Sequence, residues 1–223
     1  MNPMPPIIKV CGMREPDNIR AVEALGIDLI GFIFWPRSSR YVAQRPAYLP
    51  ERCKRVGVFV DEDIEAVRSI AADYALDYIQ LHGHESPDYI RALCSVCGAS
   101  VAIIKAFNIA TAADLDQTAA YAGVADLFLF DTKGKAVGGN GEKFDWTVLS
   151  AYDGDVPFLL SGGIGPDDAP ALRTFFSAGC GSVAAKCVGI DLNSRFEIAP
   201  ALKDVASLRR FLTQLPHPSH QTH

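Results

Sequence analysis

Two residues able to exchange protons with a bound molecule follow apolar segments that are far apart in the chain. Cys11 follows the run 7–10 and precedes Gly12, and Asp131 follows the run 127–130. A thiolate accepts a proton and a carboxylic acid donates one, so the pair suits proton transfer at two substrate atoms. Cysteine is also a common small core residue and aspartate a common turn residue, so both interpretations stay open here.

Two turns and one arginine could bind an anionic substrate. The turn 161–166, SGGIGP, precedes a predicted helix, so its main chain can approach an anion beside the helix N-terminus. A second turn, 189–194, precedes another short predicted helix. Arg40 could hold a carboxylate through two hydrogen bonds, with an ordinary solvated arginine as the alternative. The candidate phosphate-binding residues are Gly162, Gly163, Asp191, Asn193 and Ser194.

These residues must be positioned by eight short apolar runs, most of which are followed by an amphipathic segment. Near-continuous apolar runs bounded by turn residues are typical of strands in a covered parallel sheet. The predicted strands are 7–12, 29–34, 55–60, 78–82, 101–107, 127–131, 157–162 and 182–187. The predicted helices are 16–26, 61–74, 86–98, 111–123 and 165–179. The segment after the second strand is the weakest helix candidate, because it contains two prolines.

Eight strand–helix repeats predict an α/β fold, a single (β/α)8 TIM barrel of the phosphate-binding type. A doubly wound open sheet is less favoured, since no GxGxxG follows the first strand. The barrel is expected to span 1–215 and the end, 216–223, to be a disordered tail. Barrels of this kind carry their active sites at the carboxyl ends of the strands and bind phosphate after strands seven and eight.

Strand alternation predicts what surrounds the two proton-transfer candidates. Asp131 falls on the same side as Leu127 and Leu129, so a barrel would place its carboxyl at the mouth above apolar neighbours, where desolvation favours the neutral acid. Cys11 shares a face with Lys9. A nearby cation or a helix N-terminus promotes the thiolate form, so Lys9 is a candidate for activating the thiol.

Composition narrows the class of protein. The 223 residues are 49% hydrophobic and 21% charged, which is enough to bury one sizeable core. A net charge of −5 with no dense basic stripe argues against nucleic acid as a partner. No apolar stretch approaches the roughly 20 residues of a membrane span, and no signal-peptide pattern opens the chain. We therefore expect no membrane association, reduced thiols and a cytoplasmic protein.

The remaining chemistry-bearing residues predict no metal ion and no cofactor. Cys94 and Cys97 form a CxxC inside a predicted helix, with no second ligand pair. His82 follows the fourth predicted strand, and no acidic residue lies at metal-ligand spacing from it. The glycine-rich loop 138–141 fits either a mobile lid or a plain flexible loop.

Seven stretches, in order through nearly the whole chain, carry a family resemblance. They are KVCGMR (9–14), GFIFWPRSSRYV (31–42), VGVFV (56–60), QLHG (80–83), LFDTKGKAVGGNGEKFDW (129–146), LSGGI (160–164) and GIDLNSRFE (189–197). Together they resemble the phosphoribosylanthranilate isomerase family of tryptophan biosynthesis. Other phosphate-binding barrels share the SGGI-type turn, but not the CG of the first strand with the late FDW segment.

The resemblance implies a cofactor-free Amadori rearrangement of N-(5-phosphoribosyl)anthranilate to 1-(2-carboxyphenylamino)-1-deoxyribulose 5-phosphate. By motif position, Cys11 matches the general base that removes the proton from C2 of the sugar, and Asp131 the general acid that protonates the ribose ring oxygen. Arg40 matches the arginine that binds the anthranilate carboxylate. Gly162, Gly163 and the 191–194 turn match the phosphate positions. The expected partner is this small-molecule substrate, and the expected assembly is a monomer or homodimer.

Three residues depart from the pattern of the family. Asn140 stands where the glycine-rich loop usually has Ser or Thr, Arg195 where many members have Gly, and Ala201 where Gly is common. The arginine at position 195 raises the question of whether the turn takes a left-handed conformation there.

Two other functions are weighed against this one. A related sugar-phosphate isomerase of histidine biosynthesis would more naturally use carboxylates at the ends of strands one and six, whereas Cys11 stands at the first. A non-catalytic phosphate-ligand binding barrel should lack an intact acid–base pair, and here both members are present.

Overall fold

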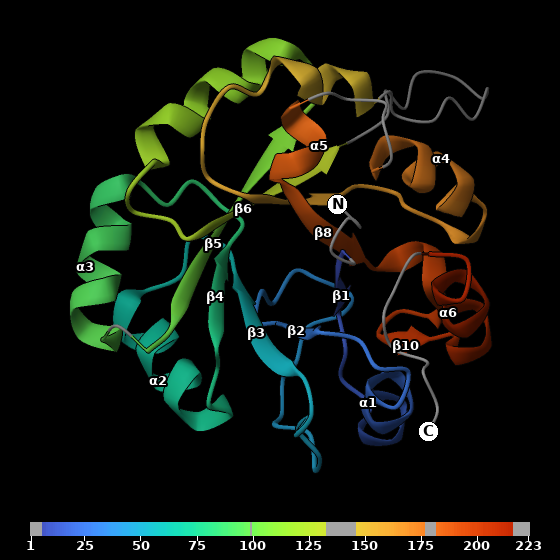
Figure 1. Ribbon diagram of the computed structural model, residues 1–223. Helices are drawn as coiled ribbons and strands as arrows, with labels where there is room; N and C mark the ends of the chain where they lie inside the picture. The colour runs from blue at the N-terminus through green and yellow to red at the C-terminus, as the bar shows by residue number, and fades with distance from the viewer. Residues whose placement is uncertain (1–5, 99, 133–145, 177–181, 216–223) are drawn as a thin grey trace.

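The computed structural model of this chain describes residues 6–98, 100–132, 146–176 and 182–215. Eight parallel strands form a closed barrel in chain order, with helices around it (Figure 1). The predicted (β/α)8 barrel is therefore confirmed. The strands are β1 (Ile7–Cys11), β2 (Leu29–Ile33), β3 (Lys54–Phe59), β4 (Tyr78–Leu81), β5 (Ala102–Ile109), β6 (Leu127–Thr132), β7 (Phe158–Ser161) and β8 (Cys187–Leu192).

The last strand differs from its prediction. The segment predicted as strand 182–187 is the helix α5 (Ser182–Lys186), and β8 begins only at Cys187. Alanine and lysine favour a helix in this segment, while the glycine and aspartate of β8 resemble turn residues in the sequence. Gly189 lies inside β8 because the main chain of Ile7 occupies the place where a Cβ would be. Asp191 is consequently a strand residue rather than a turn residue.

Helices and short 3-10 helices cover the outside of the barrel (Figure 1). The segment 34–53, described throughout, contains turns and no helix, as its prolines suggested. None of the helices in the described residues is long and apolar enough to span a membrane. The elements are α1 (Pro16–Glu23), α2 (Ile64–Tyr74), α3 (Pro87–Cys97), η1 (Ala112–Tyr121), η2 (Trp146–Ala151), η3 (Pro166–Asp168), α4 (Ala169–Thr174), η5 (Ser194–Phe196) and α6 (Val205–Leu212), with a hairpin of β9 (Glu197–Ala199) and β10 (Leu202–Lys203).

Apolar side chains fill the barrel interior toward the amino-terminal ends of the strands. This cluster is separate from the larger core between the strands and the helices. Its fully buried members are Leu29, Val56, Ile104, Ala106, Leu127, Leu129 and Leu159. Polar residues follow at alternating positions of the same strands, so the chemistry is confined to the carboxyl-terminal end of the barrel.

Three aspartates fix strand register at the opposite end of the barrel. Each precedes an even-numbered strand, and its carboxylate accepts a hydrogen bond from a main-chain N–H of the preceding strand. The pairs are Asp28 with Ile8 (2.7 Å), Asp77 with Arg55 (2.9 Å) and Asp126 with Ile103 (2.7 Å). A slip of one residue would break such a bond and turn interior side chains outward, so these bonds hold the polar residues at the mouth.

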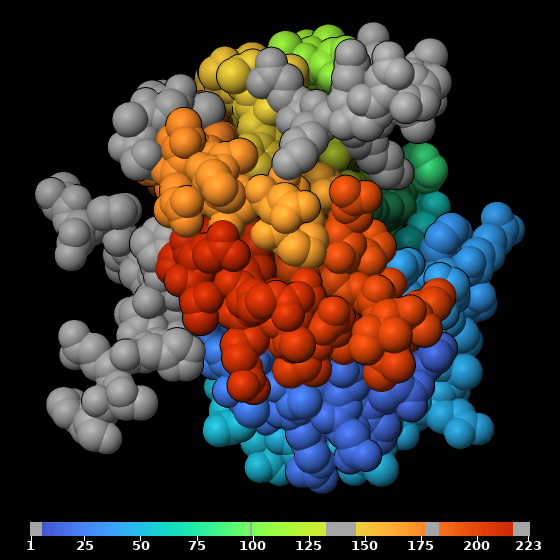
Figure 2. All heavy atoms as spheres, turned by 90° about the vertical axis from the view of Figure 1, so that its right-hand side faces the viewer, coloured from blue at the N-terminus to red at the C-terminus, as the bar shows by residue number. Residues whose placement is uncertain are grey.

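The two ends of the chain close the barrel together. Strand β1 pairs in parallel with β8, with Lys9 opposite Asp191. Behind this seam, Asn18 of α1 exchanges two hydrogen bonds with the main chain of Lys203. Figure 2 shows the result, with the red C-terminal segments packed directly against the blue N-terminal ones. The seam places residues from both ends of the sequence in one site.

Candidate active site

Cys11 lies at the carboxyl end of β1, inside the barrel, and is only 4% exposed. Its sulfur leans over Gly31 of β2, where an added Cβ would lie 2.7 Å from Sγ. Gly12 then takes φ +75°, and a Cβ there would lie 2.6 Å from Cδ of Arg40. The absence of a side chain at Gly31 makes space for the thiol, and its absence at Gly12 makes space for Arg40.

A buried cation stands beside the thiol. Nζ of Lys9 is completely buried and donates to Oδ1 of Asp191 (2.8 Å), and Lys9 lies on the same face of β1 as Cys11. Ser161 of β7 donates to the other oxygen of Asp191 (3.1 Å). Burial raises the pKa of the Cys11 thiol, and Lys9 and Lys203 only partly oppose that rise. Burial alone would lower the pKa of Lys9, but Asp191 and Cys11 raise it overall, so Lys9 stays charged.

Arg40 is held by a carboxylate that the sequence analysis did not identify. Its Nε and Nη2 form a bidentate pair with Glu197 of β9, at 2.6 to 3.0 Å. The buried Nζ of Lys203 donates to the same carboxylate (2.7 Å) and to Oδ1 of Asn193 (2.8 Å). Burial would raise the pKa of Glu197, but Arg40 and Lys203 outweigh it and lower that pKa.

One edge of the Arg40 guanidinium is still available to a ligand. The side chain is 22% exposed, and among the described residues its Nη1 makes no hydrogen bond. A guanidinium has two forks of N–H groups, and Glu197 occupies the one that contains Nε. The end-on fork of Nη1 and Nη2 can therefore bind a second carboxylate while Glu197 fixes the group.

Asp131 ends β6 on the side of Leu127 and Leu129, as the alternation predicted, and is 19% exposed. Its Oδ2 lies 3.6 Å from Nε2 of His82, which is 28% exposed. Nε2 of Gln80 lies 3.2 Å from Nδ1 of His82, so the ring is held between Gln80 and Asp131. Strands β7 and β8 separate β6 from β1 on the shorter side of the ring, so Asp131 and Cys11 reach the mouth from different sides.

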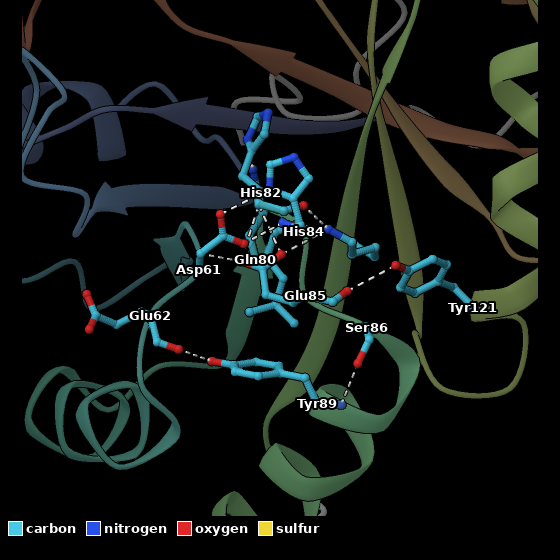
Figure 3. A network of polar contacts seen from close by, with 12 residues as sticks. Asp61, Glu62, Gln80, His82, His84, Glu85, Ser86, Tyr89 and Tyr121 are labelled. Carbon is cyan, nitrogen blue, oxygen red and sulfur yellow. Dashed lines mark hydrogen bonds and ion pairs between the residues drawn. The ribbon is translucent and has the colours of Figure 1, made fainter.

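The loop that presents His82 is fixed by a buried ion pair (Figure 3). Glu85 accepts hydrogen bonds from the main-chain N–H groups of Asp61 (2.9 Å) and Gly83 (3.0 Å). Nζ of Lys105 donates to Glu85 (3.0 Å) and to the carbonyl of Gly83 (2.7 Å). These contacts hold the main chain next to His82, so the ring stays at the mouth.

The two predicted anion-binding turns lie next to each other. Gly162 and Gly163 take φ +102° and +67°, and the main chain of Thr132 fills the place of a Cβ at Gly162. None of the described residues lies within 4 Å of a Cβ built on Gly163, so that part of the turn is free of them. Arg195 lies against the first turn, with Nε 3.4 Å from a Cβ built on Gly165.

The predicted phosphate residues of the second turn divide into two groups. Ser194 begins η5 and is exposed, and Asn193 precedes it with its Oδ1 bonded to Lys203. Asp191 instead points into the barrel, where Lys9 and Ser161 bind its carboxylate. A second anion on that carboxylate would be repelled, so the side chain of Asp191 is unsuited to the predicted phosphate contact.

The two family departures near this turn have different outcomes. Arg195 is not among the described residues with positive φ, so a side chain is tolerated there without strain. Ala201 does take the left-handed conformation, with φ +67°. The loop 138–141 with Asn140, Cys180 and the tail 216–223 lie outside the described residues. Among the described residues, Cys11, Cys53, Cys94 and Cys97 are free thiols.

Comparison with known proteins agrees with the motifs. The model of the N-(5'-phosphoribosyl)anthranilate (PRA) isomerase family matches residues 8–214. A relative named N-(5'-phosphoribosyl)anthranilate isomerase, from Phocaeicola vulgatus, is 50% identical over 209 residues, which are 94% of this chain and 97% of that protein.

Solved structures support the same assignment. Phosphoribosyl anthranilate isomerase from Thermotoga maritima has a TM-score of 0.73 at 28% identity, covering 93% of this chain and 97% of that one. A phosphoribosyl anthranilate isomerase in complex with reduced 1-(o-carboxyphenylamino)-1-deoxyribulose 5-phosphate has a TM-score of 0.71 at 26% identity, covering 93% of this chain and 96% of that one. This chain belongs to the N-(5'-phosphoribosyl)anthranilate isomerase family.

Proposed function

We propose that this chain catalyses the Amadori rearrangement of N-(5'-phosphoribosyl)anthranilate to 1-(2-carboxyphenylamino)-1-deoxyribulose 5-phosphate. The observation that carries the proposal is a thiol, Cys11, and a carboxyl, Asp131, at one barrel mouth in a chain of this family. The reaction moves hydrogen from C2 to C1 of the sugar within one molecule. An acid and a base therefore suffice for its proton transfers.

Asp131 acts as the acid and Cys11 as the base. Asp131 protonates the ribose ring oxygen, the bond from that oxygen to C1 breaks, and the nitrogen lone pair forms a C1–nitrogen double bond. Cys11, as thiolate, removes the proton from C2, and the electrons give an enolamine. Protonation at C1 and loss of the hydroxyl proton at C2 yield the ketone. Atoms balance, because C2 is oxidised and C1 reduced by the same electron pair.

Arg40 and the two turns hold the ends of the substrate. The free fork of Arg40 accepts the anthranilate carboxylate, while Glu197 keeps the guanidinium in place. The phosphate lies against Gly162 and Gly163 and against the turn at Asn193 and Ser194, where main-chain N–H groups offer hydrogen bonds. The carboxylate of Asp191 takes no part in holding the phosphate.

Loss of either proton-transfer residue tests this function. Consumption of freshly prepared phosphoribosylanthranilate is followed by its fluorescence. We expect Cys11→Ser and Asp131→Asn each to lower kcat by about 100-fold or more, since proton transfer contributes about that much. Cys94→Ser is the matched thiol control, because Cys94 is exposed on α3, and it should keep wild-type kcat.

Three results would count against the proposal. Near-normal turnover in both site variants would remove the assigned roles. Isomerisation of a histidine-pathway substrate, with phosphoribosylanthranilate left intact, would favour the related isomerase. Binding of phosphoribosylanthranilate without turnover would favour a binding barrel. A cytoplasmic location, a barrel domain at 1–215 and a monomer or homodimer stay predictions, and sedimentation measures the last.

A further inference from the structure

The proposed mechanism gives no role to Lys9, the most deeply buried charged side chain of the mouth. Lys9 has no exposed surface, yet it carries an ammonium group inside the barrel, two residues before Cys11 on the same face of β1. Burying a charge is costly unless it is paired, and proteins seldom keep such a group without compensation. Its partners are Asp191, at 2.8 Å, and the thiol of Cys11.

The charges around Cys11 form one connected cluster that comes from five parts of the fold. Its members are Lys9 of β1, Asp191 of β8, Arg40 of the loop after β2, Glu197 of β9 and Lys203 of β10. Three cations face two carboxylates, which leaves one excess positive charge while Cys11 is a neutral thiol. Conversion of Cys11 to the thiolate makes the cluster neutral, so the cluster favours that form.

Within the cluster, Lys9 is the cation best placed to serve the thiol. Arg40 and Lys203 both bind Glu197, and Lys203 also donates to Asn193. The free edge of Arg40 is needed for the substrate carboxylate in the proposed function. Lys9 lies two residues before Cys11 on the same face of β1 and, of the nearby cations, lowers the pKa of that thiol most. Ser161 and Lys9 between them hold both oxygens of Asp191. Asp191 thus holds the ammonium group of Lys9 in place near Cys11.

We propose that Lys9 is the positioning residue that stabilises Cys11 as a thiolate, with Asp191 and Ser161 anchoring its ammonium group. This inference rests on the proposed function, in which Cys11 is the base. It also assigns Asp191 a role in place of the phosphate contact predicted from the sequence. A thiolate in contact with an ammonium group keeps its proton affinity low enough to exist in a buried site.

The test compares two variants that differ only at Lys9. Asp191→Asn keeps the ammonium, and Lys9→Met with Asp191→Asn removes it without leaving a lone buried carboxylate. The Cys11 thiolate is titrated by its ultraviolet absorbance, as the difference from the same protein carrying Cys11→Ser. We expect the midpoint to lie at least about one pH unit higher without Lys9. At neutral pH, kcat should fall by about tenfold or more.

The outcomes separate this inference from a structural role and from the proposed function. Equal midpoints in the two variants would overturn the inference, because a lysine that only neutralises Asp191 would not move the titration. Urea unfolding checks that both variants fold, and Lys9→Gln, combined with the same Asp191→Asn change, replaces the Met variant if that one does not. Full turnover in Cys11→Ser alone would instead reject Cys11 as the base, whatever its titration shows.

Discussion

At the scale of single residues, what Cys11 can do is set by neighbours on three different strands. Its environment is made by Lys9 on its own strand, by Gly31 on the next one and by Asp191 across the barrel seam. Burial pushes the thiol toward its protonated form, and the adjacent cations work against that. The buried thiol can therefore act as a base only where nearby cations offset the effect of burial on its pKa.

Gly31→Ala tests how closely the thiol is positioned. An added Cβ would lie 2.7 Å from Sγ of Cys11 and 3.2 Å from its Cα, so the sulfur must move. We expect kcat to fall and the free energy of unfolding to drop by about 1–3 kcal/mol, as for other overpacked sites. Steady-state kinetics and urea unfolding measure the two effects.

Gly57→Ala in β3 is the matched control. An added Cβ there would press on Leu76 and Phe59, outside the barrel and away from the thiol. It should cost stability and leave the kcat of the folded protein unchanged. A Gly31→Ala variant with wild-type kcat would show that the sulfur position is not critical.

The sequence made Cys11 and Asp131 candidates and placed Lys9 on the same face as the thiol, but it did not indicate what holds Arg40. Cys11 and Asp131 each end an apolar run, and strand alternation gave the correct face for Asp131. Glu197 and Lys203 lie beyond the last strand, in a hairpin whose fold-back onto Arg40 leaves no periodic signal. Only the resemblance pointed to that region, because Glu197 ends one of the matched stretches.

At the scale of elements, seven strands could be predicted because each is a continuous apolar run buried on both faces. Strand β8 broke that rule, since Gly189 is required by a close main-chain approach and Asp191 by its pairing with Lys9. The three register-fixing aspartates all precede strands, where the sequence shows only ordinary turn residues. Strand β8 was therefore not predicted, because Gly189 and Asp191 interrupt its apolar pattern.

Helix α2 contains an element-scale defect that a substitution can repair. It ends at Ala75, which is exposed and takes a left-handed conformation with φ +46°. Glycine adopts that conformation without the steric cost of a Cβ. We expect Ala75→Gly to raise the free energy of unfolding by about 0.5–1 kcal/mol, measured by urea unfolding.

The control for this prediction lies three residues earlier in the same helix. Ala72 is exposed and helical, so Ala72→Gly should lower the free energy of unfolding by about 1 kcal/mol. Opposite signs at the two positions attribute the effect to backbone conformation rather than to alanine removal. Destabilisation at both would contradict the assignment of strain at Ala75.

At the scale of the whole molecule, the barrel is closed by the same charges that build the site. Asp191 joins the last strand to the first through Lys9, and Glu197 joins the hairpin after β8 to Arg40, 157 residues away. Lys203 adds a second link through the paired hydrogen bonds with Asn18. The proposed site and the closure of the fold therefore share one set of residues, so substitutions in the proposed site should also change stability.

This sharing predicts an acid-dependent loss of stability that Glu197 controls. Arg40 and Lys203 lower the pKa of Glu197 below its unfolded value despite burial, so its stabilisation is complete above the ordinary carboxyl range and is lost as pH falls through the lowered pKa. Glu197→Gln leaves the buried Lys203 and the partly exposed Arg40 without a carboxylate partner. We expect it to lower the free energy of unfolding at pH 7 by about 3–5 kcal/mol.

The difference between wild type and Glu197→Gln should begin to shrink below about pH 4, because the unfolded chain then binds a proton at Glu197 before the folded protein does. Urea unfolding of both proteins between neutral and acidic pH measures the two curves. Glu65→Gln is the control, since Glu65 pairs with Arg68 on the exposed face of α2 and such pairs contribute about 1 kcal/mol or less. A gap between wild type and Glu197→Gln that stays constant with pH would mean that the charge of Glu197 does not hold the chain ends together. If the difference in free energy of unfolding shrinks at low pH, protonation of Glu197 contributes to acid unfolding by weakening the contact between the two ends of the chain.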